Sequence, residues 1–341
     1  MVSGKLEDPV IDMKLSSTAA FFETGKLGIS EVLKDRTINA PVFEGDILYR
    51  KNLLIVKKLQ VFSGDEEYRA SGSVEFKKAK MIFDVREPDY DLNISVRNID
   101  AKVLSGTFRD SPHFTGRLNS DFRFYGKPVD LRAAGSVKGS NVSLNGVYSA
   151  DSADGFVSYA NKDFYFKKMR FVRGKSFLSG DGRLSIHKQF SFKAEGSNIK
   201  LYDVLPDKLK IKNSKIPLME TVVLEGMRLK GEGRLDSPRI DIISGLYGGD
   251  YKGMSIGKGY IKGNVSNGKA EGEFSFLDGK LKIEGKADLK DKMPWSVKIN
   301  MQPARYDFLL SGLLKDVPDD FLLNLSGDII AKGDSDNISA D

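Results

Sequence analysis

Short runs in which apolar and polar residues alternate, separated by glycine, asparagine or aspartate, fill most of this chain. They are clearest between Gly231 and Leu310, which includes LYGGDYKGMSIGKGYIKGNV and GEFSFLDGKLKIEGKADL. Alternation over roughly four to eight residues between turn residues is typical of half-buried β-strands. Only RYDFLLSGLL (residues 305–314), which overlaps the end of this stretch, has a helical pattern. The sequence therefore predicts an all-β protein with a few short helices.

A strand–turn–strand motif, GxLxxPxID, recurs along the chain. Residues 4–12 carry it, residues 233–241 repeat it with the same spacing, and residues 126–131 and 333–341 hold looser forms. Proline cannot donate a hydrogen bond to a strand ladder, so it belongs at a strand start or a turn. The recurrence predicts an array of one unit.

The end of each predicted unit changes from a strand pattern to a short helix pattern, at residues 92–104, 192–206 and 297–310. Residues 27–33 could form a further short helix. We expect Asp100, Asp203 and Asp307 to cap the three junction helices. The repeat of about 100 residues predicts one continuous segment, 1–341, of a longer protein. Its approximate units are residues 3–110, 111–228 and 229–314, with the start of the next unit at 315–341.

Glycines punctuate the central hairpin of each predicted unit. We expect them to adopt positive φ in turns or to mark β-bulges. They are Gly64, Gly72, Gly174, Gly180, Gly182, Gly279 and Gly285.

The number of predicted strands constrains the shape of the sheet. Turns recur often enough for roughly 24–28 strands, which at about 4.8 Å each form a ladder of roughly 115–135 Å. Open sheets of more than about ten strands curl or split because their twist accumulates. The predicted sheet can therefore take one of two shapes. It either closes into a barrel or sandwich, or it forms a long curved groove. Few helices are available to cover the face, so a groove would need an apolar occupant.

Composition excludes several classes of protein. Cysteine is absent, which rules out disulfides and thiolate metal sites. The 53 Lys and Arg residues alternate with 47 Asp and Glu residues, which predicts solvated sheet faces rather than a nucleic-acid track. No apolar run could span a membrane as a helix, and the N-terminal residues lack a signal-peptide pattern. The strand pattern at both ends indicates a segment of something longer.

Candidate catalytic groups are isolated. His113 and His187 lie in unlike contexts without carboxylates at a recurrent spacing, and the SxxK matches at residues 185–188 and 197–200 lack the motifs that accompany catalytic ones. Trp295, next to a proline, is expected to pack at a strand start. We expect no enzymatic activity, no catalytic residue, no metal and no cofactor.

Taken together, GxLxxPxID, the YxGxxIGxGYIxG sequence of residues 251–263, FxFLDGxLxIxG, PWxxxI and the DFLL-type helix resemble the TamB-like members of the AsmA-like family. The resemblance covers most of the chain but contains no catalytic signature. It implies a β-taco, a long curved sheet with a hydrophobic groove. It also implies a bridge-like lipid transfer protein of the bacterial cell envelope, located in the periplasm and involved in outer-membrane biogenesis.

The same resemblance implies that phospholipid acyl chains move through the groove between the inner and outer membranes. An N-terminal helix would anchor the full-length protein in the inner membrane, and a C-terminal region could contact an outer-membrane barrel partner. This sequence contains neither the anchor nor the C-terminal family region. We expect no nucleic-acid partner.

The predicted groove is lined by large apolar side chains that alternate along the strands. The candidates are Val74, Phe76, Met81, Phe83, Val85, Leu92, Ile94, Val96, Phe122, Phe124, Phe190, Phe192, Phe274, Phe276, Leu281, Ile283, Val297, Ile299 and Met301.

Periodicity alone is equally compatible with other β proteins. A closed β-rich scaffold, structural or serving outer-membrane-protein assembly, would use the same residues as a dry core and conduct no lipid. A right-handed β-helix enzyme such as a carbohydrate lyase is a third possibility. Clustered carboxylates and a coil period of roughly 20–25 residues, which such an enzyme would show, are missing from the sequence.

Overall fold

The structure is a computed structural model of the chain. It describes residues 2–5, 8–17, 20–23, 37–40, 42–77, 88–102, 114–144, 148–204, 221–251, 254–255, 257–289, 293–306, 322–334 and 338–340. The chain forms two compact units, Met1–Phe171 and Val172–Asp341.

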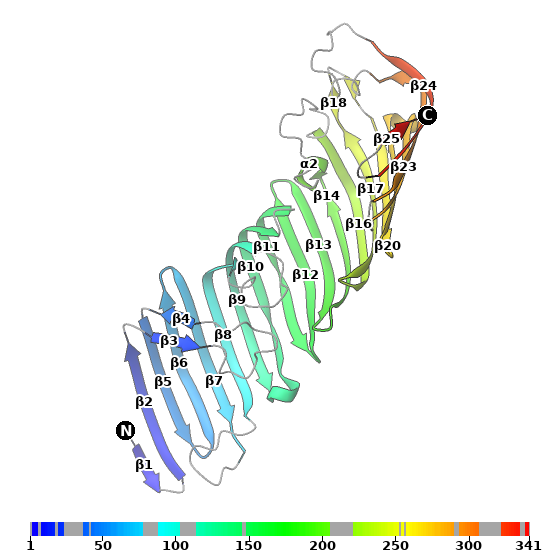
Figure 1. Cartoon of the computed structure of the whole chain (residues 1–341). Helices are drawn as coiled ribbons and strands as arrows, with labels where there is room; N and C mark the ends of the chain where they lie inside the picture. The colour runs from blue at the N-terminus through cyan, green and yellow to red at the C-terminus, as the bar shows by residue number, and fades with distance from the viewer. Residues whose placement is uncertain are drawn as a thin grey trace. The chain divides into compact units, whose positions relative to one another are not determined.

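The first unit is an antiparallel sheet in which strands that follow each other in sequence also lie side by side (Figure 1). A small separate hairpin pairs β3 (Ala20–Glu23) with β4 (Thr37–Ala40). The 3-10 helix η2 (Pro128–Asp130) connects two strands of the main sheet, and β12 (Asp163–Arg173) crosses into the second unit. The main sheet contains β1 (Val2–Lys5), β2 (Asp8–Ser17), β5 (Val42–Arg50), β6 (Leu53–Ser63), β7 (Glu66–Glu75), β8 (Asp89–Asp100), β9 (Phe114–Gly126), β10 (Arg132–Leu144) and β11 (Tyr148–Ala160).

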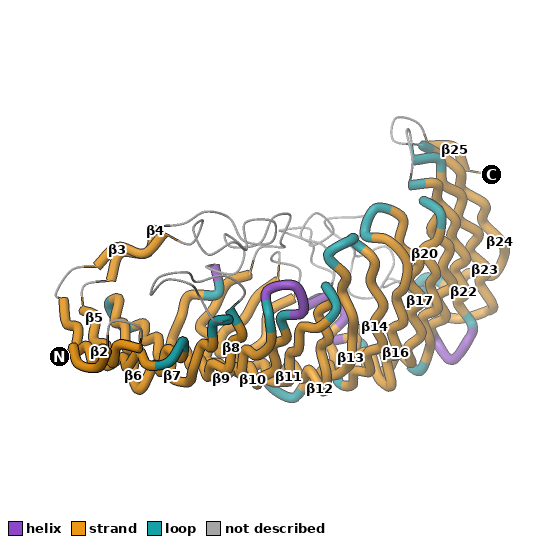
Figure 2. Tube along the Cα trace, turned by 90° about the horizontal axis from the view of Figure 1, so that it is seen from below, coloured by secondary structure: helices purple, strands orange, loops and turns teal. Residues whose placement is uncertain are grey.

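The second unit repeats this arrangement, and the tube view shows its strands in succession from β13 to β24 (Figure 2). Helix α2 (Leu201–Val204) and the 3-10 helix η3 (Leu277–Gly279) are short, and β18 (Asp250–Tyr251) pairs with β19 (Met254–Ser255) as a separate hairpin. The sheet contains β13 (Ser176–Ser185), β14 (Gln189–Ser197), β15 (Ile199–Lys200), β16 (Val222–Arg234), β17 (Ser237–Gly248), β20 (Gly259–Ser266), β21 (Lys269–Phe276), β22 (Leu281–Asp288), β23 (Trp295–Arg305), β24 (Asn324–Gly333) and β25 (Ile338–Ala340).

These sheets are open: among the described residues, no pairing joins the outer strands of either unit into a barrel. The prediction of an all-β, antiparallel fold with few short helices is confirmed. The alternating sequence explains it, because successive side chains of a strand point to opposite faces and one face of each strand is apolar. The repeat boundaries drawn from the sequence stay a prediction.

The glycine predictions are confirmed in part. Gly64, Gly72, Gly174 and Gly279 have positive φ, as expected for turns and irregular strand positions. The prediction is wrong for Gly180, Gly182 and Gly285, which lie in regular strands without positive φ. At Gly180 the reason is space, because an added Cβ would lie 2.3 Å from the carbonyl oxygen of Lys193 on the next strand.

The ends of the first two predicted repeat units, at residues 92–104 and 192–206, share one backbone conformation. Asn98 and Asn198 both adopt left-handed conformations, with φ of 56° and 57°. The Asn98 side chain donates to the carbonyl of Asp65, and the Asn198 side chain donates to the carbonyl of Lys175. Both carbonyls belong to the residue that follows a turn glycine of the preceding hairpin.

A third carbonyl at the corresponding turn position accepts a different donor. The Tyr306 hydroxyl shares its proton between the carbonyl of Gln302, at 2.6 Å, and the carbonyl of Lys280, which follows the turn glycine Gly279, at 3.1 Å. Tyr306 is fully buried, and burial raises the pKa of its hydroxyl. The ends of the predicted units are therefore held to their own hairpins by related hydrogen bonds.

The capping predictions have different outcomes. The Asp100 carboxylate accepts a hydrogen bond from the Lys102 N–H at 2.9 Å, as an N-cap residue would. The prediction for Asp203 is wrong, because this residue lies inside α2 and pairs with Arg173 at 3.2 Å. Asp307 and the helix predicted at residues 27–33 lie outside the described residues.

Candidate functional site

One face of the first sheet collects the predicted apolar side chains in matching rows. Leu92 of β8 lies opposite Phe124 of β9, and Ile94 lies opposite Phe122. These side chains are half-buried, whereas Arg123, which lies between the two phenylalanines on β9, is exposed. The Phe122 and Phe124 rings are 6.1 Å apart between centroids. Register therefore places four of the predicted residues next to one another on what we call the apolar face.

The second sheet has an equivalent apolar face. Phe274 of β21 lies opposite Ile283 of β22, which in turn lies opposite Ile299 of β23. All three are half-buried. Phe190 and Phe192, on β14, stack with their ring centroids 6.0 Å apart. Within this unit, cross-strand register assembles side chains that are separated in sequence into continuous apolar rows.

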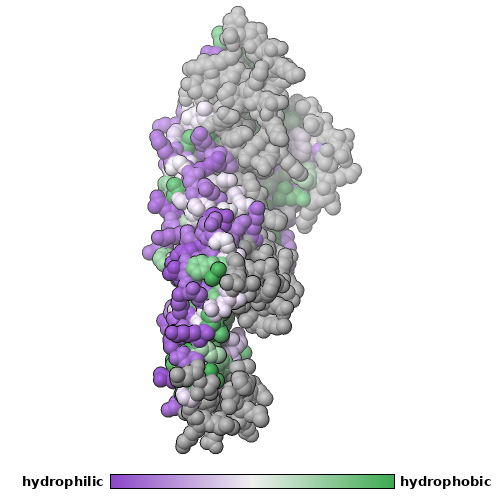
Figure 3. Space-filling view, turned by 90° about the vertical axis from the view of Figure 1, so that its left-hand side faces the viewer, coloured by the Kyte–Doolittle hydropathy of each residue, from purple (hydrophilic) through white to green (hydrophobic). Residues whose placement is uncertain are grey.

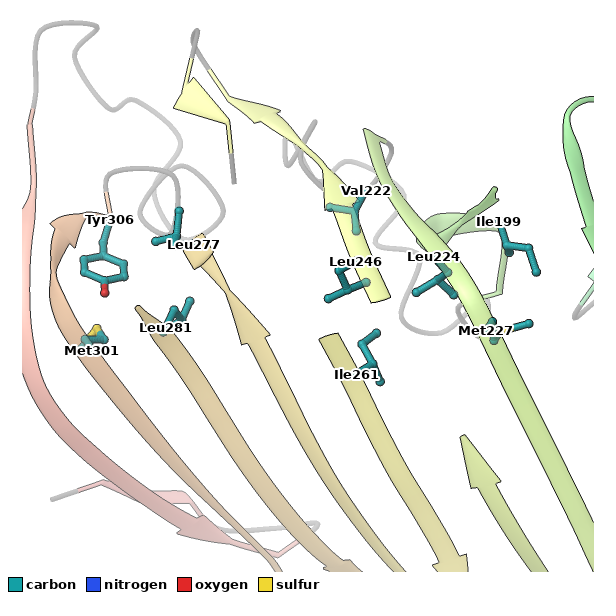
Figure 4. Packing of buried hydrophobic residues seen from close by; sticks show 10 residues of the cluster. All are labelled: Ile199, Val222, Leu224, Met227, Leu246, Ile261, Leu277, Leu281, Met301 and Tyr306. Atoms are coloured by element: carbon teal, nitrogen blue, oxygen red, sulfur yellow. The ribbon is translucent and has the colours of Figure 1, made fainter. Parts of the chain in front are cut away.

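A packed rim of buried residues follows one long edge of each apolar face. In the second unit these residues lie near the ends of successive strands (Figure 4). Leu281 is 2% exposed and Met301 is 7% exposed, so these two predicted groove residues belong to the rim. The rim comprises Ile199, Val222, Leu224, Met227, Leu246, Ile261, Leu277, Leu281, Met301 and Tyr306 in the second unit and Ile99, Ala101, Leu118, Val142 and Ala153 in the first.

The remaining predicted residues comprise one buried residue, a set of half-buried residues and three residues outside the described part of the chain. Val74 is buried, and Phe76, just after β7, is half-buried. Met81, Phe83 and Val85 lie outside the described residues. The half-buried ones are Phe76, Leu92, Ile94, Val96, Phe122, Phe124, Phe190, Phe192, Phe274, Phe276, Ile283, Val297 and Ile299.

Several further residues of the apolar face were missed by sequence reasoning. Ile242 lies opposite Leu229, and Met13 lies opposite Ile47. The alternation of their strands could have identified them. A second feature has no simple sequence signal: phenylalanine rings lie over glycines of neighbouring strands. A Cβ added at Gly231 would lie 2.1 Å from a ring carbon of Phe192.

The opposite face is charged. Arg123 of β9 donates two hydrogen bonds to Asp91 of β8, at 2.8 and 3.0 Å. These bonds lower the pKa of the Asp91 carboxyl below its ordinary value. Hydrogen bonds from Ser95 and then Arg97 likewise lower the pKa of Asp121. The described surface that Figure 3 turns towards the reader is mostly hydrophilic.

Nothing in the described part of the chain forms a metal-binding group of His, Cys, Asp or Glu side chains. His187 is exposed, and its backbone N–H donates to the Ser185 hydroxyl in a turn, whereas His113 lies outside the described residues. Trp295 begins β23 and lies opposite Ala287, as the strand-start prediction stated. In the residues that the structure covers, no helix has both the length and the apolar character needed to cross a membrane.

Comparison with known proteins does not identify a family for this chain. No protein-family model matches the sequence, no curated protein matches it, and no solved structure matches the fold.

Proposed function

We propose that the apolar faces bind the acyl chains of phospholipids and that the chain is a segment of a lipid transfer protein. The observation that carries this proposal is that part of the apolar face stays half-buried beside the packed rim. We call this half-exposed part of the apolar face the stripe. Phe274, Ile283 and Ile299 remain half-buried although they lie in the middle of a sheet with partners on both sides. Apolar surface that a protein does not bury by itself commonly marks a binding surface.

The chemistry of the stripe suits a flexible hydrocarbon. It presents phenylalanine, leucine and isoleucine without charged side chains, while the ion pairs lie on the opposite face. Burial of a methylene group contributes about 0.8 kcal/mol, so an acyl chain can be held without any specific residue. Such binding tolerates movement along the surface, which a conduit needs.

In the full-length protein, this segment would carry phospholipid through the periplasm between the inner and outer membranes. This part of the proposal follows the resemblance to TamB-like proteins. The inner-membrane anchor and a contact with an outer-membrane barrel partner would belong to regions beyond this sequence. No catalytic residue or cofactor takes part.

The competing proposal is a β-rich scaffold, structural or for outer-membrane-protein assembly, whose apolar face is dry. Lipid extraction separates the two. The chain is purified from a bacterial host, and bound lipid is quantified by mass spectrometry for the parent, Ile283→Asp and Glu284→Lys. We expect phospholipid on the parent and on Glu284→Lys, and much less on Ile283→Asp. A parent without phospholipid, or equal amounts on all three proteins, would contradict acyl-chain binding.

A further inference from the structure

Two connections of the first sheet place a lysine at the long edge opposite the packed rim. Strand β9 passes Leu118, a rim residue, and ends just before Lys127, which precedes η2. Strand β11 passes Ala153, also in the rim, and ends just before the turn to β12 that contains Lys162. Both lysines are exposed. The apolar face of this unit therefore has a packed apolar edge on one side and lysines on the other.

One cross-strand row of the apolar face borders these lysines. Phe124 of β9 lies opposite Ala133 of β10, which in turn lies opposite Tyr159 of β11. Phe124 and Tyr159 are half-buried, and they lie three residues before Lys127 and Lys162, respectively. Three residues span at most about 10 Å, and the flexible lysine side chain extends the reach of its ammonium group. Each lysine is therefore a neighbour of a half-exposed ring of the stripe.

Lys162 has a backbone conformation that glycine adopts more easily. In the two-residue turn between β11 and β12, Asn161 and Lys162 have φ of 52° and 64°. The two-residue turn between β20 and β21 has similar φ, 53° and 74°, but is formed by Asn267 and Gly268. The left-handed conformation is strained for lysine and unstrained for glycine. A charged side chain at a strained position that glycine could occupy indicates a function for the charge.

Left-handed lysines recur at turns of this kind in both units. Lys51, with φ of 46°, lies between β5 and β6, three residues before Leu54, which is opposite the predicted groove residue Val74. In the second unit Lys188, with φ of 63°, lies between β13 and β14, two residues before Phe190. Antiparallel register places each turn at the strand ends that lie away from the rim of its own unit. A lysine next to an apolar row is therefore a repeated feature of this edge.

Carboxylates near the two lysines of the first unit do not neutralise them by direct pairing. Asp130, in η2, pairs with Arg132 at 2.9 Å, and Asp163 is only 5% exposed. Asp89, at the start of β8, is exposed. Among the residues that the structure describes, neither lysine has an ion-pair partner. The two connections lie two strand spacings apart, roughly 10 Å. An anion at this edge therefore meets two ammonium groups that are not engaged in ion pairs there.

We propose that Lys127 and Lys162 bind the phosphate of a phospholipid whose acyl chains lie on the adjoining stripe. The inference rests on the proposed acyl-chain binding and adds an orientation, with the headgroup at the lysine edge and the chain ends towards the rim. A phospholipid carries its negative phosphate close to the glycerol esters of its acyl chains, which matches cations next to a half-exposed apolar row. Hydrogen bonds from ammonium groups to phosphate are charge-assisted and stronger than neutral ones.

Lipids that share acyl chains but differ in headgroup test this orientation. The full chain is incubated with dioleoyl phosphatidylglycerol or with dioleoylglycerol in mixed micelles, and gel filtration removes free lipid before mass spectrometry. The edge variants are Lys127→Gln and Lys162→Gly. Because glycine relieves the backbone strain, Lys162→Gly should be at least as stable as the parent in urea. The control is Lys138→Gln, which removes an exposed charge in the middle of β10.

We expect each edge variant to lower bound phosphatidylglycerol by about twofold to fivefold. Dioleoylglycerol should stay at the parent level, and Lys138→Gln should affect neither lipid. Parent-level phosphatidylglycerol on the edge variants, or an equal loss on Lys138→Gln, would overturn the lysine assignment without affecting acyl-chain binding. Equal loss of both lipids would also overturn it. A parent that binds neither lipid would instead contradict acyl-chain binding, and this inference with it.

A bilayer surface is the other source of phosphate, and sedimentation with phosphatidylglycerol vesicles distinguishes it. The edge variants should lose lipid bound to the protein after gel filtration. Weaker sedimentation with vesicles at an unchanged amount of bound lipid would show that the lysines contact a membrane surface, and it would overturn the proposal.

Discussion

The Phe192 ring lies directly over Gly231 of the neighbouring strand, so closely that a Cβ at Gly231 would be 2.1 Å from the ring. The Phe122 ring also comes close to Gly135 of β10, where an added Cβ would lie 2.6 Å from a ring carbon and 2.0 Å from the carbonyl oxygen of Asp121. Glycine thus provides space for a ring to lie along the sheet.

Substitution of Gly231 tests this packing. Gly231→Ala forces the Phe192 ring to move, and we expect a loss of about 1–3 kcal/mol in the free energy of unfolding, as overpacking typically causes. Urea denaturation measures the loss. Gly285→Ala is the control, because it lies on the same face with φ in the ordinary region and its added Cβ would be 3.8 Å from Val297. Equal losses in the two variants would argue against the ring–glycine contact.

A charged substitution should have different effects in the half-exposed stripe and in the packed rim. Ile283→Asp should keep the fold and lower bound lipid roughly tenfold, since contact with about two methylene groups is lost. Phe276→Arg should act in the same direction. Leu281→Asp, two residues from Ile283 but buried in the rim, should lose cooperative unfolding because its carboxylate has no water. Circular dichroism and thermal melts distinguish these outcomes. Unfolding of Ile283→Asp would favour the dry-core scaffold.

The left-handed asparagine at the end of a unit gives a third prediction. Asn198→Ala should lower the free energy of unfolding by about 1–3 kcal/mol, since alanine is strained at φ 57° and cannot replace the hydrogen bond to Lys175. Asn198→Gly should cost less, because glycine adopts this conformation without strain. Chemical denaturation compares them. A glycine variant as unstable as the alanine variant would show that backbone strain is not the main cause.

The ion pairs on the charged face predict that the stability of the fold decreases at acidic pH. The native pKa of Asp91 lies below the ordinary carboxyl value of about 3.9, so the stabilisation is present above pH 4 and is lost as pH falls through the native pKa. Melting temperatures of the parent and Asp91→Asn should therefore differ at pH 6 and converge towards pH 2. In an Arg123→Gln background the same substitution should show little pH dependence. A difference that persists unchanged at pH 2 would contradict this account.

The sequence was sufficient for the fold class and for the composition of each face. Leu92 and Phe124 could be assigned to an apolar face by alternation, but their contact depends on register, which alternation does not determine. Likewise Leu281 and Ile283 have the same pattern, yet one lies in the packed rim and the other in the half-exposed stripe. Leu281 is buried because strand ends pack together around it in the rim, and alternation along a strand does not show where strand ends pack. Gly180 was wrongly assigned to a turn or bulge. Glycine is required both in such turns and where a neighbouring strand approaches closely, and the sequence does not distinguish the two.

The central claim is that the half-exposed apolar face contacts acyl chains, and site-specific photo-crosslinking in living bacteria tests it most directly. A photoreactive residue is placed at Ile283, on the apolar face, and separately at Glu284, the next residue on the charged face. The two positions lie on the same strand and differ in the face of the sheet that they present. We predict that position 283 captures phospholipid and position 284 does not. Absence of captured lipid at 283, or equal capture at both positions, would contradict the claim.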